Sequence, residues 1–136
     1  MHWKLEVVTI PVADLERAKS FYVEQVGFNV DIDHRISDEV RMIQLTAPGS
    51  ACSVHLGAGP DVVPGSIKDV FLVVPDVRAA RAHLVDRGVD VSEVKVFDDG
   101  SYRTSREGDV LDNVGCVFFS DPDGNRWVVQ QIPARD

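Results

Sequence analysis

The sequence repeats itself at a fixed offset, and this repeat constrains the fold more than any other feature. VVTIPVADLERAKSFYVEQVGFNV begins at Val7, and DVFLVVPDVRAARAHLVDRGVDV begins at Asp69. A shift of 62 positions places Asp14 on Asp76. Each copy predicts an apolar strand, an aspartate that caps a helix, the helix itself and a glycine that ends it.

The apolar residues after each aspartate recur three or four positions apart, as on one face of a helix. In the first copy these residues are Leu15, Ala18, Phe21, Tyr22 and Val26, and in the second they are Val77, Ala80, Leu84 and Val85. Three strand-like runs follow each helix. They cover residues 28–34, 39–45 and 52–58 in the first copy and 89–97, 115–121 and 126–132 in the second.

Each half therefore predicts the order strand, helix, strand, strand, strand. The Gly/Pro-rich stretch 57–66 is typical of a junction between the halves. One such module has too little sheet and helix to bury its faces well, whereas two can share a core. We predict an α+β fold in one domain over residues 1–136, with a first module at about 1–60 and a second at about 66–134.

The modules differ in the long polar connection 98–113, DDGSYRTSREGDVLDN, which carries Tyr102. Connections of this length in compact domains are often lids or mobile segments. The sequence leaves open whether this one contacts a ligand or is a plain disordered loop.

Composition narrows the classes of partner. The chain is 44% apolar and 26% charged, as soluble globular proteins are. Its net charge of −8 repels phosphate backbones, so nucleic acid is not expected as a partner, although a cationic ligand would be tolerated. The apolar runs are too short to cross a bilayer, and the N-terminal residues lack a signal-peptide pattern, so no membrane partner and a cytoplasmic location are expected. Cys52 and Cys116 match no zinc spacing and are expected to be free thiols.

Two segments carry a family resemblance. VTIPVADLERAKSFYVEQVGF (8–28) and FSDPDGNRWVVQQ (119–131) resemble the two ends of the vicinal oxygen chelate superfamily. That group includes glyoxalase I, bleomycin- and fosfomycin-resistance proteins, extradiol dioxygenases and methylmalonyl-CoA epimerases. The resemblance implies two tandem βαβββ modules that form a cup-shaped mixed β-sheet with the helices outside, often in a homodimer. Its functional implication is weaker, since this fold hosts both metal enzymes and binders.

The resemblance also implies where a divalent metal would be bound, at one cup-facing position on each of four strands. Here those positions are Val7, His55, Asp69 and Val128. Because two valines cannot ligate a metal, no metal site and no cofactor are expected. A one-residue shift gives Glu6, Val54, Lys68 and Trp127, which is no better.

The same cup-facing parity, with Tyr102 added from the long connection, implies a ligand-binding set. Its members are Val7, Thr9, His55, Asp69, Phe71, Tyr102, Arg126, Val128 and Gln130. His55 and Asp69 are the candidate catalytic pair, since a His–Asp couple supports acid/base chemistry; His55 can equally be a structural strand histidine. His34, near Asp31 and Asp33, is interpreted as part of a solvated hairpin, with both aspartates on one side of the strand.

The leading hypothesis is a small-molecule-binding protein of the glyoxalase/bleomycin-resistance type that lacks the family metal site and holds its ligand in the cup between the modules. The alternative is a lyase, isomerase or dioxygenase that uses a divalent metal with a rearranged ligand set, or a metal-free His55/Asp69 couple. A third hypothesis is a partner-binding domain that has kept only the scaffold. A homodimer is expected in each case.

Overall fold

The computed structural model describes residues 1–133, in two compact units. The first unit contains residues 1–67 together with Asp121–Asn125, and the second contains the described residues that remain. Residue 134, the predicted end of the second module, lies outside the described residues. The grouping of both modules into one domain stays a prediction.

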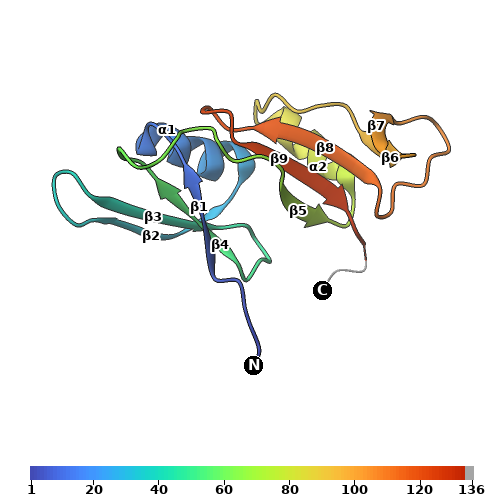
Figure 1. Ribbon diagram of the computed structural model, residues 1–136. Coiled ribbons are helices and arrows are strands. Elements are labelled where there is room, and N and C mark those ends of the chain that lie inside the picture. Colours follow the sequence, from blue (N-terminus) through green and yellow to red (C-terminus); the bar gives the residue numbers. More distant parts are fainter. Residues whose placement is uncertain (134–136) are drawn as a thin grey trace. The chain divides into compact units, whose positions relative to one another are not determined.

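The first unit has a four-stranded mixed sheet in the order β1-β4-β3-β2, in which β1 runs parallel to β4 (Figure 1). Its elements are β1 (Val7–Pro11), α1 (Leu15–Ser20), the π-helical η1 (Phe21–Val26), β2 (Asn29–Arg35), β3 (Arg41–Thr46) and β4 (Ser53–Gly57). The π-helical turn continues α1 directly and ends at Gly27, which adopts a left-handed φ of 102°. Glycine meets no Cβ clash in that conformation, which explains its place at this helix end.

The second unit repeats this architecture in a five-stranded sheet of order β5-β9-β8-β6-β7, with β5 parallel to β9. Its elements are β5 (Val70–Val74), α2 (Val77–Asp86), β6 (Lys95–Asp98), β7 (Ser101–Thr104), β8 (Gly115–Ser120) and β9 (Arg126–Gln131). The predicted tandem βαβββ fold is confirmed.

Both helices begin as the repeat predicts. Asp14 accepts a hydrogen bond from the Arg17 backbone N–H at 3.1 Å, and Asp76 accepts one from Ala79 N–H at 3.1 Å. Each aspartate has an extended backbone, as helix N-caps do.

Three local predictions need correction. The connection 98–113 is not one long loop, because it contains β7, which pairs with β6 across a tight turn. After β7, Arg103 binds Asp109 through two hydrogen bonds of 2.9 Å, which holds the following turn in place. The run 89–97 forms a strand only from Lys95.

The third correction concerns the hairpin β2–β3. Its register shifts between Val30 and Ile32, so Asp31 sits in a β-bulge. Asp31 accepts a hydrogen bond from the Thr46 hydroxyl, while Asp33 bonds Lys19 of α1. The two aspartates therefore face opposite sides of the strand, because the bulge breaks the alternation on which the prediction rested.

Each sheet buries one face and exposes side chains on the other. On the buried face of the second sheet, Val117, Trp127 and Val129 lie on strands that α2 contacts. On the buried face of the first sheet, Ile10, Ile43 and Leu56 are almost fully buried. The residues that alternate with these, and so point to the other face of each sheet, include the site residues predicted from the sequence.

No helix in the described chain is long and apolar enough to cross a membrane.

Candidate functional site

The open face of the second sheet carries a row of apolar side chains across three strands. Phe71 of β5 pairs with Val128 of β9, and Val128 pairs with Phe118 of β8. Because paired residues of adjacent strands project from the same face, these three side chains lie side by side.

Aromatic rings extend this row toward β6 and β7. The ring of Tyr102 lies 5.0 Å from that of Phe118 and 5.1 Å from that of Phe97, both in edge-to-face geometry. Phe71, Phe97 and Tyr102 expose 50%, 47% and 42% of their surface. We call Phe71, Phe97, Tyr102 and Phe118 the aromatic face. Exposed apolar groups gathered in this way mark binding surfaces, because leaving apolar surface in contact with water is unfavourable and a bound ligand would cover it.

A fixed positive charge borders the aromatic face. The Arg126 guanidinium lies 5.7 Å from the centre of the Phe118 ring, where the negative face of the ring attracts it. Asp69 Oδ1 accepts a hydrogen bond from Nε of Arg126 at 2.6 Å and forms an ion pair with Nη2 at 2.6 Å. Asp69 also adopts a left-handed φ of 61°. A strained backbone of this kind is frequent at functional sites, and here it places the carboxylate that holds Arg126.

The polar groups within the face are neutral. Burial raises the pKa of Tyr102, and the neighbouring Cys116 thiol raises it further. Burial likewise raises the pKa of the Cys116 thiol. At neutral pH Tyr102 therefore keeps the proton that it can donate, and Cys116 lacks the thiolate that a nucleophile requires.

Two predicted ligand residues on this face have structural roles. The Gln130 amide donates to the Asn113 carbonyl at 2.7 Å and anchors the segment before β8. Val128 is almost fully buried beside Phe71 and Phe118. Both residues have the predicted parity: Val128 lies at the base of the face, and Gln130 is half-buried with its amide engaged by Asn113.

The predicted residues of the first unit also share one face of their sheet. Thr9 pairs with His55 across β1 and β4, and Val7 stands two residues before Thr9. His55 lines a cavity of about 450 Å³ together with the exposed apolar side chains of Ile36, Val40 and Met42. No hydrogen bond reaches the His55 ring from any described residue. The imidazole is thus available to a ligand in this cavity.

The His55/Asp69 couple stays a prediction. His55 belongs to the first unit and Asp69 to the second, where Arg126 engages its carboxylate. Within residues 1–133, no three His, Cys, Asp or Glu side chains gather closely enough to hold a metal ion.

Sequence reasoning missed Phe97, Phe118 and Met42 as residues of these faces. The signal was present for Phe118, which stands opposite Val128 once the two strands are paired. No sequence signal places Phe97 beside Tyr102, because the segment that forms β7 lies in a polar stretch that does not predict a strand.

Comparison with known proteins agrees with this architecture. The family model described as Glyoxalase/Bleomycin resistance protein/Dioxygenase superfamily matches residues 4–129. TnmS3, an antibiotic binding protein from Streptomyces sp. CB03234, is 31% identical with a TM-score of 0.74, over 96% of this chain and 97% of its own.

Two further solved structures are similar over nearly their whole length. A glyoxalase/bleomycin resistance protein, also from Streptomyces sp. CB03234, is 32% identical with a TM-score of 0.71, over 94% of this chain and 100% of its own. A superfamily member from Sphaerobacter thermophilus DSM 20745 is 27% identical with a TM-score of 0.71, over 96% and 98%. No curated protein sequence matches the chain.

Proposed function

The chain belongs to the Glyoxalase/Bleomycin resistance protein/Dioxygenase superfamily, and from that premise we propose that it binds an antibiotic or a similar organic molecule and holds it without chemical change. The observation that carries this proposal is the exposed aromatic face of the second sheet. The description of TnmS3 as an antibiotic binding protein supports it.

The chemistry of the face indicates what the ligand contains. Phe71 and Phe97 offer exposed rings on which an aromatic or unsaturated ligand can pack. Arg126 and Tyr102 supply hydrogen-bond donors, which suit carbonyl and hydroxyl oxygens. The ligand therefore combines a flat apolar part with oxygen acceptors at its edge.

We further propose that binding needs no divalent metal. Val7 and Val128, at two of the four family positions, have no donor atom. At a third position, the Asp69 carboxylate is paired with Arg126, whose positive charge opposes a second cation. A metal-dependent lyase, isomerase or dioxygenase is the competing hypothesis. About one tightly held ion per chain, in protein purified without chelator, would support that hypothesis instead.

The binding proposal is tested by titrating the protein with a panel of aromatic natural products, including bleomycin, using isothermal calorimetry. We expect at least one compound to bind and Phe71→Ala to weaken it about tenfold, because the exposed ring is lost to the ligand. The matched control is Val85→Ala, which removes an exposed apolar side chain from α2, on the opposite face. Equal affinity for both variants would contradict the assignment to the aromatic face.

A further inference from the structure

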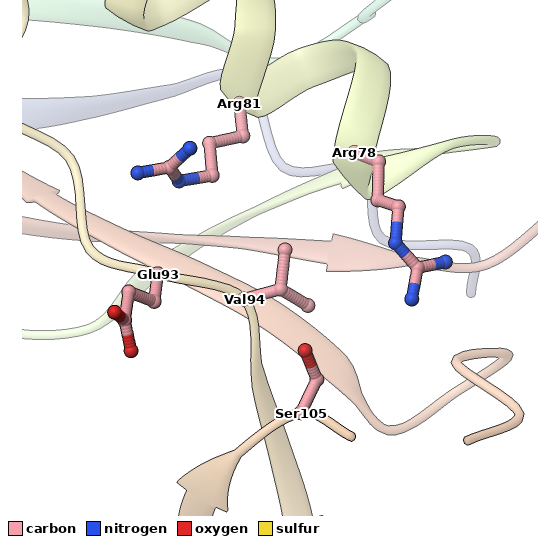
Figure 2. Close-up of a pocket in the computed structure, with 5 residues that line it drawn as sticks. All are labelled: Arg78, Arg81, Glu93, Val94 and Ser105. Carbon is pink, nitrogen blue, oxygen red and sulfur yellow. The ribbon is translucent and has the colours of Figure 1, made fainter. Parts of the chain in front are cut away.

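A second cavity opens in the second unit between α2 and the segment that leads into β6, on the side of the sheet away from the aromatic face. Its volume is about 410 Å³, within the range of small-molecule sites. The residues that line it are Arg78, Arg81, Glu93, Val94 and Ser105 (Figure 2). We propose that this cavity binds a small organic oxyanion, a carboxylate or a phosphate, at a site separate from the aromatic face.

Two uncompensated positive charges carry this proposal. Neither Arg78 nor Arg81 forms an ion pair with any residue from 1 to 133. Arg81 donates from Nε to the Ser92 carbonyl at 2.9 Å, which fixes its guanidinium and leaves the terminal nitrogens available. The cavity thus holds two arginines and one carboxylate, Glu93, so its lining is net positive in a chain whose net charge is −8.

Helix stability does not explain these arginines. Arg78 and Arg81 are three residues apart on α2, so their like charges lie on one helix face and repel each other. Arg78 is also in the first turn, where the helix dipole disfavours a cation; the acidic residue at this end is the N-cap Asp76, whose carboxylate accepts from Ala79 N–H. A bound oxyanion would relieve both unfavourable terms.

The remaining lining residues define the ligand further. In Figure 2 the two guanidinium groups flank Val94, which gives the cavity an apolar floor. The Ser105 hydroxyl has no partner within the described chain and can donate to an anion. Glu93, whose carboxylate accepts from the Thr104 hydroxyl at 3.4 Å, lies at one end and disfavours a second negative charge there. The ligand that fits is a small organic molecule with one anionic group, which the arginines bind, attached to an apolar or hydroxylated part.

The test is an NMR titration of the full chain with inorganic phosphate and, separately, with benzoate. We expect saturable shifts of amide signals in residues 77–81, 93–95 and 105 with at least one probe, and the tighter probe identifies the head group. Arg78→Gln should weaken that binding about tenfold, since a charge-assisted hydrogen bond is lost. Ser105→Ala should weaken it less, because it removes a neutral donor.

The control variant is Arg35→Gln, which removes one positive charge from β2 in the other unit. We expect its affinity for the probe to equal that of the wild type. The proposal is overturned if neither probe saturates below about 10 mM, or if Arg78→Gln and Arg35→Gln bind alike. Far-UV circular dichroism confirms that each variant is folded before it is titrated.

Discussion

The turn between β8 and β9 is built around two side chains that water does not reach. Asp121 Oδ1 accepts hydrogen bonds from the backbone N–H groups of Asp123 and Asn125, each at 2.9 Å. Asp121 Oδ2 accepts from the Tyr22 hydroxyl at 2.7 Å and from the Asn125 amide at 2.8 Å. A buried carboxylate with this many donors is stable because each lone pair it withdraws from water finds a partner.

Asn125 links this turn to two other segments of the first unit. Its Nδ2 donates to the Pro11 carbonyl at 2.8 Å, and its Oδ1 accepts from Ile67 N–H at 3.1 Å. Gly65 lies against the same turn, and a Cβ there would stand 2.1 Å from the Asp123 carbonyl oxygen. The sequence DPDGN thus forms a turn, as its composition predicts, and also closes the first unit.

Asn125→Ala is expected to lower the free energy of unfolding by about 2–4 kcal/mol, because it removes the Nδ2 hydrogen bonds to Pro11 O and Asp121 Oδ2 and leaves Ile67 N–H without its acceptor. Urea unfolding followed by circular dichroism measures this change. Asn29→Ala, at an exposed position of β2, is the control and should change stability by less than about 0.5 kcal/mol. A loss for Asn125→Ala no larger than that of the control would show that the network adds nothing to stability.

At the scale of elements, an ion network joins α1 to the β2–β3 hairpin. Asp33 of β2 accepts from Lys19 of α1 at 2.6 Å and from Nε and Nη2 of Arg41 on β3 at 2.8 and 2.7 Å. Arg41 also binds Glu16 of α1. These hydrogen bonds, first to Arg41 and then to Lys19, hold the pKa of Asp33 well below its usual range.

The sign of this shift predicts a pH dependence. A carboxyl group with a lowered pKa in the folded state stabilises the protein above its unfolded pKa of about 3.9, and this stabilisation is lost as the pH falls toward the folded pKa. Asp33→Asn should therefore lower the melting temperature at pH 7. The difference from wild type should narrow as the pH falls below about 4, where the wild type loses the same stabilisation.

Thermal denaturation at a series of pH values measures this difference. Asp38→Asn is the matched control, because Asp38 lies in the same hairpin. Its backbone carbonyl accepts from Arg35, but its carboxylate bonds to no residue in the described part of the chain. It should show little difference at any pH. If the difference in melting temperature between Asp33→Asn and wild type stays constant from pH 7 to pH 3, the proposed role of the Asp33 charge is contradicted.

Some features of the helices and strands could be predicted from the sequence, and others could not. The helix caps at Asp14 and Asp76 were predictable because a capping bond is local, spanning three residues. The bulge at Asp31 and the strand β7 were not, because each depends on which strand lies alongside. Alternation assigns faces correctly only while the register is unbroken.

At the scale of the whole molecule, exposed apolar side chains precede the first strand. Trp3 and Leu5 expose 86% and 70% of their surface, and they alternate with polar residues as the side chains of a strand do. Such a segment is suited to pairing with a second copy of the chain, since an unpaired strand-like segment offers free backbone groups. This observation supports the predicted homodimer.

Sedimentation equilibrium should accordingly give twice the mass of one chain at micromolar concentration. Trp3→Ser combined with Leu5→Ser is expected to shift the protein toward the monomer, while circular dichroism stays unchanged. His2→Ser combined with Lys4→Ser is the control for the polar positions of the same segment. A wild-type protein that sediments as a monomer would refute the prediction.

The sequence by itself determined the repeat, the two helix caps, the parity of the strands without a bulge and the absence of donor atoms at Val7 and Val128. These features follow from local spacing and residue chemistry, which hold wherever the chain is placed. Only the tertiary structure decided that Asp69 holds Arg126 over Phe118, that Phe97 joins Tyr102, and that two arginines of α2 share a cavity. These arrangements depend on contacts between residues far apart in the chain, which strand register and side-chain packing establish and spacing does not encode.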